Sequence, residues 1–220
     1  IEGWTFQQLR AALMADPTLD GDLDAVSDAE LMDGLGMPGM HPEGWFFPDT
    51  YFHTRGHDRL RVLERAHARM QTELESAWQR RQGDLPFDTR YEGLILASMI
   101  ERETGLDGER RKVAGVLVRR LREGMRLQTD PTVIYGMGDA YQGRIRRSDL
   151  RRDTPYNTYT RYGLTPTPIA MPGRDALRAA FDPDEGEALY FVSRGDGSHH
   201  FSATLDEHNA AVRRYILGER

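Results

Sequence analysis

The sequence of 220 residues contains no cysteine and only one lysine, Lys112. The absence of cysteine excludes disulfide bonds and metal sites built on thiolates. Positive charge is also in deficit, because 35 Asp and Glu residues outnumber 29 Lys and Arg residues and the formal net charge is −6. A nucleic-acid-binding domain normally carries a basic surface, so we expect no nucleic-acid partner.

Long hydrophobic runs are absent as well. No stretch approaches the ~20 apolar residues that a membrane-spanning helix requires, and no signal peptide is recognisable. The chain begins with Ile1 and not with methionine, and we therefore expect a piece of a longer protein; any anchor or further domain upstream would lie outside this sequence. The 39% of hydrophobic and 29% of charged residues are typical of a globular protein with a substantial core.

The spacing of apolar residues predicts a mainly helical chain. Helices are expected over residues 5–15, 28–35, 58–82, 89–104, 107–123 and 205–217. Asp107 is expected to cap its helix, and Pro131 is expected to hold Asp130 in an extended conformation. A long loop covers 153–173, and the Gly-rich turn within 188–202 predicts a β hairpin. The fold class is therefore α+β, mainly helical with a small antiparallel sheet, divided into an N-terminal part (1–88) and a core (89–220).

Two glutamates in the stretch ILASMIERETG, residues 95–105, differ in their predicted surroundings. At about 100° per residue on a helix, Glu103 lies on the same side as the apolar stripe of Leu96, Met99 and Ile100. Glu101 lies on the far side and is expected to face water. A carboxylate in an apolar stripe is costly unless it is paired or protonated. Glu103 is therefore either a catalytic acid or one half of a structural ion pair with an arginine.

Chain geometry favours a site around Glu103. The helix over 107–123 would rise roughly 25 Å from the turn that follows Glu103, and an extended segment can return over a similar distance. Arg126, Gln128 and Asp130 are therefore expected beside Glu103. An acid in apolar surroundings that faces polar groups is the arrangement required for sugar cleavage. The prolines and aromatic residues of 156–172 suit a groove that stacks on sugar rings.

Histidines and one serine suggest other chemistries. His53 and His57 are four residues apart, and His199 and His200 lie far downstream, so a metal hydrolase is an alternative. No H-E-x-x-H or comparable ligand motif occurs, and we expect no metal or other cofactor. Ser98 lies in the middle of a predicted helix, without the exposed elbow that a nucleophilic serine needs.

Five segments carry a resemblance to a known family: EGWFFPDTY, LASMIERET, RLQTDPTVIYGMG, PYNTYTRYGL and GDGSHHFSATLDEHN. Together, and in this order over nearly the whole chain, they resemble the YceG-like family of endolytic murein transglycosylases. The resemblance implies cleavage between N-acetylmuramic acid and N-acetylglucosamine within peptidoglycan strands, leaving 1,6-anhydro ends. It also implies a bacterial inner-membrane protein with a single N-terminal helix, a LysM-like domain upstream and the catalytic part in the periplasm. A partner would be peptidoglycan synthesis machinery, so that the enzyme ends growing strands.

The resemblance also assigns residues. In the family's E-x-E-T pattern the second glutamate is catalytic, and that position is Glu103 here. The family's conserved cleft falls on Gln128, Asp130, Tyr156, Asn157 and Tyr159. The stretch GLTPTPI departs from the family's usual GLPPGPI at Thr165 and Thr167, which leaves the shape of that loop open. A hydrolytic muramidase, with Asp130 as the second carboxylate, and a non-catalytic glycan-binding module remain as alternatives.

Overall fold

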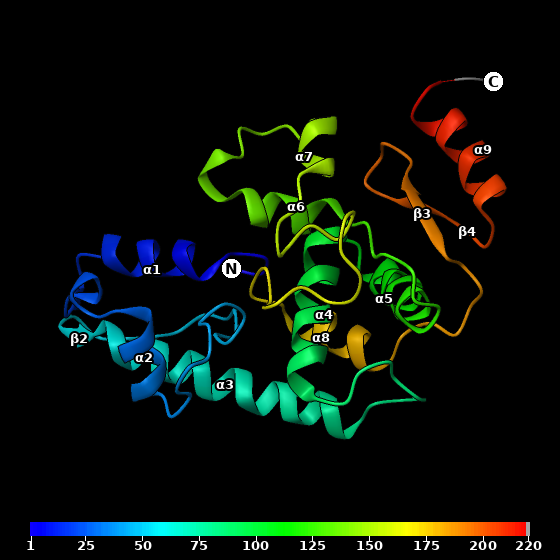
Figure 1. Ribbon diagram of the computed structural model, residues 1–220. Coiled ribbons are helices and arrows are strands. Elements are labelled where there is room, and N and C mark those ends of the chain that lie inside the picture. Colours follow the sequence, from blue (N-terminus) through cyan, green and yellow to red (C-terminus); the bar gives the residue numbers. More distant parts are fainter. Residues whose placement is uncertain (219–220) are drawn as a thin grey trace.

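The computed structural model describes residues 1–218, and helices dominate it (Figure 1). Its elements follow in the order α1 (Phe6–Ala15), β1 (Leu19–Asp20), η1 (Leu23–Ala25), α2 (Asp28–Gly34), β2 (His57–Asp58), α3 (Arg59–Gln79), α4 (Arg90–Glu103), α5 (Asp107–Arg122), α6 (Asp130–Met137), η2 (Gly138–Ala140), α7 (Arg147–Arg151), α8 (Arg174–Phe181), β3 (Tyr190–Ser193), β4 (His199–Ser202) and α9 (Leu205–Tyr215). The predicted α+β class and the predicted helices are confirmed, with ends that differ by up to three residues.

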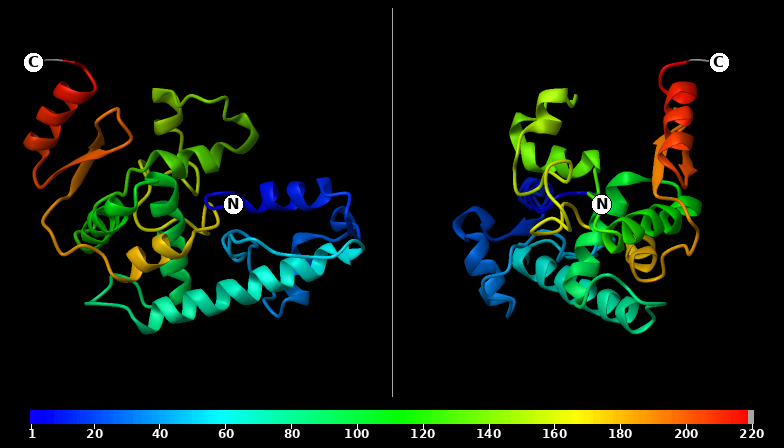
Figure 2. Two further views of the ribbon diagram at one scale, coloured as in Figure 1. Left: turned by 180° about the vertical axis from the view of Figure 1, so that it is seen from behind. Right: turned by 45° about the vertical axis from the view of Figure 1, so that its right-hand side comes forward.

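Helix α4 is the central element of the fold. It begins with a capping box, in which the Thr89 side chain accepts from the Glu92 backbone N–H and the Glu92 side chain accepts from that of Thr89. Every residue from Gly93 to Ile100 is buried. The cause is that α3, α5 and α8 all pack against α4, as two directions of view show (Figures 1 and 2). A helix covered on all sides can carry apolar side chains all round.

Helix α8 packs against α4 and was not among the predicted helices. Its small residues Ala176, Ala179 and Ala180 are buried and let its backbone approach α4 closely. At the closest point Gly93 of α4 faces the ring of Phe181, and a Cβ atom added to this glycine would overlap the Phe181 Cζ atom. The contact between α4 and α8 thus depends on the missing side chain of Gly93.

The predicted hairpin is confirmed and is joined to α5. Strands β3 and β4 pair antiparallel, with Tyr190 opposite Ser202 and Ser193 opposite His199. The backbone N–H of His199 donates to Glu109 Oε1 at 3.0 Å, and its Nδ1 lies 2.8 Å from Glu109 Oε2. The hairpin and α9 form one projection of the molecule, and α6 with α7 forms another (Figures 1 and 2). Helix α6 contacts the end of α4 that carries Glu103, whereas the hairpin contacts α5.

Two local predictions are wrong. Asp107 does not cap α5 but is its first residue, and the capping position is taken by Leu106, which makes no side-chain cap hydrogen bond. Asp130 is not extended, because α6 begins at this residue with Pro131 in its first turn. Proline is tolerated there because the first N–H groups of a helix have no intrahelical acceptor. The extended segment therefore ends at Thr129.

One hydrophobic cluster runs through the molecule. It contains side chains of α1, α3, α4, α5 and α8, together with the aromatic segment 45–47, so residues 1–88 and 89–218 share it. None of the helices within residues 1–218 has the length and apolar character needed to cross a membrane.

We predict that Gly93→Ala destabilises the protein. The added methyl group must displace Phe181, which is buried at the contact of α4 and α8, and overpacking of this kind costs about 1–3 kcal/mol. Gly108→Ala in α5 is the matched control. A methyl group added at this position has no atom within 4 Å beyond its chain neighbours and the backbone of its own helix. Urea denaturation of both variants should show a loss for Gly93→Ala only. Equal stability of the two variants would contradict the close packing.

Candidate active site

Glu103 lies at the C-terminal end of α4 with its carboxyl group turned into the protein. The three stripe residues Leu96, Met99 and Ile100 are fully buried beneath it, as the sequence predicts. Its Oε2 atom is buried and has no hydrogen-bond partner among residues 1–218. Burial, with a smaller contribution from the negative charge of Asp130, raises the pKa of Glu103 from 4.5 to about 8. The group is therefore a protonated acid at neutral pH, which is the state that a general acid needs.

Glu101 does not face water, and that prediction is wrong. Its side chain is only 5% exposed, because α5 and the segment before α8 cover this side of α4. The Glu101 Oε2 accepts a hydrogen bond from the Gly173 backbone N–H at 2.8 Å, and Oε1 lies 3.6 Å from Arg110 Nη2. Burial raises the pKa of Glu101, whereas Gly173 and Arg110 act in the opposite direction. Glu101, and not Glu103, is therefore the glutamate of α4 that pairs with an arginine, Arg110.

The segment after α5 lies beside the loop 153–173, as chain geometry requires for a site at Glu103. The Gln128 N–H donates to the Thr158 carbonyl at 3.1 Å, and the Thr129 N–H donates to Thr158 Oγ1 at 3.1 Å. The Tyr159 hydroxyl donates to Asp130 Oδ1 at 2.6 Å, and burial and this carboxylate both raise the pKa of Tyr159. Asp130 and Tyr159 thus form a fixed polar pair whose negative charge acts on Glu103.

Gln128 has an unusual backbone. With φ at +54°, it is the one non-glycine residue in the left-handed region among residues 1–218. Arg120 of α5 stabilises this segment: its guanidinium donates to the carbonyls of Arg126 (3.1 Å), Leu127 (3.0 Å) and Leu189 (2.6 Å) and to Gln128 Oε1 (3.3 Å). Strained residues of this kind persist where the surroundings fix them, and they are frequent at functional sites.

Sequence reasoning missed Arg120, although a signal was present. Val113, Val116 and Leu117 form the inner face of α5, and Arg120 continues that face at helical spacing. Arg120 is 7% exposed, and no carboxylate of residues 1–218 pairs with it. Burial lowers the pKa of Arg120 from its usual value. A buried arginine in an apolar stripe is as informative as the buried glutamate of α4.

Another buried carboxyl group, that of Glu43, was not singled out from the sequence and contacts two other elements. Glu43 is 2% exposed and accepts hydrogen bonds from the Phe6 N–H at 2.9 Å and the Tyr135 hydroxyl at 3.0 Å. Burial raises the pKa of Glu43 to about 7. The Tyr135 and Tyr156 rings form a T-shaped contact with their centres 4.9 Å apart. The Tyr156 hydroxyl lies 2.9 Å from Thr167 Oγ1. Glu43 therefore links α1 to α6 directly through its two hydrogen bonds, and Tyr135 continues this link to the loop 153–173.

Asn157 holds the loop from inside. It is 1% exposed, its amide donates to three backbone carbonyls between residues 149 and 152, and its oxygen accepts from the Tyr159 N–H at 2.8 Å. Asn157 thus supports the loop through its amide group, and its predicted sugar contact stays a prediction. Thr165 and Thr167 are also accommodated, because each hydroxyl donates to a carbonyl of the loop itself. Gln128 and Asp130 are exposed, and Tyr156 and Tyr159 are half-buried.

Ser98, His53 and His199 make contacts within the protein. The Ser98 hydroxyl is buried, donates to the Ile95 carbonyl at 2.7 Å and accepts from the Ile169 N–H at 3.0 Å. His53 lies 3.5 Å from an Asp16 oxygen, and His199 is bound to Glu109. Across residues 1–218, no group of three or more His, Asp or Glu side chains is arranged to hold a metal ion.

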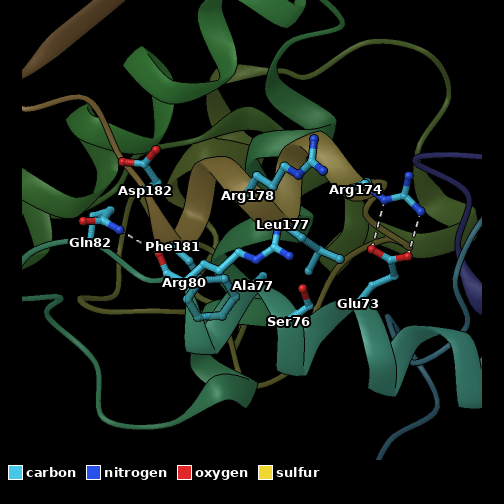
Figure 3. A pocket seen from close by; sticks show the side chains of 10 residues that line it. All are labelled: Glu73, Ser76, Ala77, Arg80, Gln82, Arg174, Leu177, Arg178, Phe181 and Asp182. Atoms are coloured by element: carbon cyan, nitrogen blue, oxygen red, sulfur yellow. Dashed lines mark hydrogen bonds and ion pairs between the residues drawn. The ribbon is translucent and has the colours of Figure 1, made fainter.

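A cavity of about 230 Å³ between α3 and α8 is separate from this site (Figure 3). Glu103 does not line it. The one glutamate on its wall, Glu73, makes two hydrogen bonds to Arg174 of 2.9 and 2.7 Å, and this partner lowers the pKa of Glu73. Glu73 is therefore ionised at neutral pH and cannot act as an acid there, unlike Glu103.

The strain at Gln128 gives a stability prediction. Gln128→Gly and Gln128→Ala both remove the side chain that Arg120 contacts, but only glycine adopts a positive φ without cost. We expect the glycine variant to be more stable than the alanine variant by about 1 kcal/mol, measured by urea denaturation. An alanine variant as stable as the glycine variant would show that the backbone at 128 carries no strain.

Comparison with known proteins places this geometry in a family. The sequence matches the YceG-like family over residues 1–214. A protein of Bacillus subtilis strain 168 named endolytic murein transglycosylase is 37% identical over 177 residues, which are 80% of this chain and 49% of that protein. A protein of the same name from Streptococcus pneumoniae strain D39 is 28% identical over 180 residues, 79% of this chain and 32% of its own length. The chain thus spans half or less of these curated relatives.

The fold agrees with a solved structure. The crystal structure of a putative yceG-like protein from Listeria monocytogenes is similar with a TM-score of 0.77 and 28% identity. The similarity covers 96% of this chain and 74% of that one. The fold and the motifs around Glu103 therefore agree with the match over 1–214, and the chain belongs to the YceG-like family.

Proposed function

We propose that this chain is the catalytic part of an endolytic peptidoglycan lytic transglycosylase. The observation that carries the proposal is the Glu103 carboxyl group, whose Oε2 atom is buried without a hydrogen-bond partner among residues 1–218 and whose pKa burial raises to about 8. The names of the relatives from Bacillus subtilis and Streptococcus pneumoniae support the same reaction class. A non-catalytic glycan-binding module would have no use for an acid in this position.

In the proposed reaction Glu103 acts twice. As an acid it donates its proton to the glycosidic oxygen between N-acetylmuramic acid and N-acetylglucosamine while that bond breaks. As a carboxylate it then takes the proton from the C6 hydroxyl of the muramic acid, whose oxygen forms a bond to the anomeric carbon. The product is a 1,6-anhydro ring, and no water is consumed. The nucleophile belongs to the substrate itself, so its effective concentration is high and one carboxyl group serves both steps.

The neighbouring residues would stabilise and orient the sugar. Asp130, fixed by the Tyr159 hydroxyl, places a negative charge near the positive charge that develops on the anomeric carbon. Gln128 is exposed beside this pair and is suited to bind sugar hydroxyl groups. Tyr156 would form part of the groove wall, and Asn157 would keep the loop in shape.

Asp130 is also the reason to consider a second candidate, a hydrolytic muramidase. A hydrolase needs a second carboxylate to activate water or to attack the sugar, and Asp130 is close enough to raise the pKa of Glu103. Its oxygen Oδ1, however, already accepts a hydrogen bond from Tyr159. That bond favours an electrostatic role over a nucleophilic one.

We further propose a cellular setting that follows from the resemblance. A single N-terminal helix would anchor the protein in the bacterial inner membrane and keep the catalytic part in the periplasm or outside the cell membrane. Residues 1–88 would support the core of residues 89–220, which carries Glu103. Association with peptidoglycan synthases would place cleavage on growing strands and end their elongation.

The products of glycan cleavage in ¹⁸O-labelled water test the function. Fragments released from purified sacculi should end in 1,6-anhydro-N-acetylmuramic acid and carry no label, since water takes no part in the reaction. Glu103→Gln should abolish cleavage because an amide cannot donate and retrieve the proton. Mass analysis of the fragment ends separates the two candidate enzymes: labelled reducing ends would identify a hydrolase.

Glu101→Gln is the control from the same helix. It weakens the contacts to Gly173 and Arg110, so it should lower the melting temperature. At a temperature where the variant is folded, it should still cleave glycan to the same anhydro ends. If Glu101→Gln were inactive while folded and Glu103→Gln active, the assignment of the acid would be overturned.

A further inference from the structure

An exposed aromatic ring and an arginine lie together on the two segments that carry Asp130 and Tyr159. The guanidinium carbon of Arg126 is 4.7 Å from the centre of the Tyr162 ring. Both residues are exposed, Tyr162 to 64%. Within the part of the chain that the structure describes, no carboxylate lies within ion-pair distance of Arg126. Neither side chain is needed to fill the core, so the pair is available to a ligand.

Arg161, in the loop 153–173, is an arginine that does form an ion pair with a carboxylate of its own loop. Arg161 lies next to Tyr162 and binds Asp153 through two nitrogens, at 2.9 Å each. This ion pair occupies the guanidinium of Arg161 and raises its pKa. Arg126 instead stacks on an aromatic ring, which leaves the edge of its guanidinium free to donate hydrogen bonds.

The pair continues the two segments that carry the candidate site. Segments 126–130 and 157–162 are joined by hydrogen bonds from Gln128 and Thr129 to Thr158. Arg126 is four residues before Asp130, a distance of at most about 14 Å along the chain. Tyr162 is three residues after Tyr159, the partner of Asp130. A glycan lying along these segments would reach Arg126 and Tyr162 about one disaccharide unit away from the Asp130 pair.

We propose that Arg126 and Tyr162 form a subsite that binds a muramyl unit carrying a free carboxylate. The aromatic ring stacks on the sugar, and the guanidinium binds the carboxylate through paired N–H groups. The carboxylate belongs either to the lactyl group of a muramic acid without its peptide or to the stem peptide. This subsite rests on the proposed function, because it takes the cleft at Glu103 to be the glycan site. It would make the enzyme prefer strands with one of these two charged forms.

Binding to a non-cleaving protein tests the subsite separately from catalysis. Glu103→Gln protein is titrated with three glycans: strands with stem peptides, strands stripped of peptide so that lactyl carboxylates are free, and uncharged chitin oligomers. Adding Arg126→Ala should weaken binding of at least one charged glycan about tenfold or more and leave chitin binding unchanged. The charged glycan that responds identifies the source of the carboxylate. Tyr162→Ala should weaken all three.

A second cation–π pair of the molecule supplies the matched control. Arg81 stacks on Trp78 at 4.1 Å, at the end of α3, and Arg81→Ala should leave binding of every glycan unchanged. The subsite is wrong if Arg126→Ala behaves like Arg81→Ala, if it weakens chitin binding equally, or if Tyr162→Ala has no effect. Wild-type protein assayed for cleavage in parallel distinguishes these results from failure of the proposed function, in which no glycan would be cleaved at all.

Discussion

The burial of the Glu103 Oε2 atom without a hydrogen-bond partner among residues 1–218 is the constraint on which the site depends. Ionising Glu103 in this position would leave an uncompensated charge in a medium of low polarity, so the group holds its proton at neutral pH. Helices α3, α5 and α8 pack against α4 and bury residues 93–100, which lie beneath the Glu103 side chain. Burying such an acid costs stability, and strongly perturbed acids of this kind are frequent at active sites.

The other buried charged groups contrast with Glu103 because each has acceptors or donors. Glu101 has Gly173 and Arg110, Glu43 has Phe6 and Tyr135, and Arg120 has four oxygen atoms. These contacts link α4, α5 and α6 with the hairpin and the loop around the site. Arg120 and Thr158 fix the segment that carries Gln128 and Asp130, and the Asp130 charge acts on Glu103.

The sequence predicts those parts of the site that depend on local patterns. The apolar surroundings of Glu103 could be predicted because the neighbours that form them lie within seven residues. The position of Asp130 near Glu103 could be predicted because a helix and an extended segment have known lengths. Glu101 was misplaced because its cover comes from Gly173, 72 residues away. Glu43 was missed for the same reason, since its partner Tyr135 is 92 residues away. Helix α8 was not predicted because it has only eight residues and directly follows the long proline-containing loop 153–173.

The pKa of the Glu103 carboxyl group, measured directly, tests the central claim. Carbon-13 NMR of protein labelled at glutamate side chains follows each carboxyl through a pH titration, and the Glu103→Gln variant identifies the Glu103 signal. We expect Glu103 to titrate near pH 8, so that its acid form is present below this pH and lost above it. Asp130→Asn should lower that pKa, since the Asp130 charge is one of its causes. A Glu103 signal that titrates near 4.5, as an ordinary glutamate does, would contradict the account.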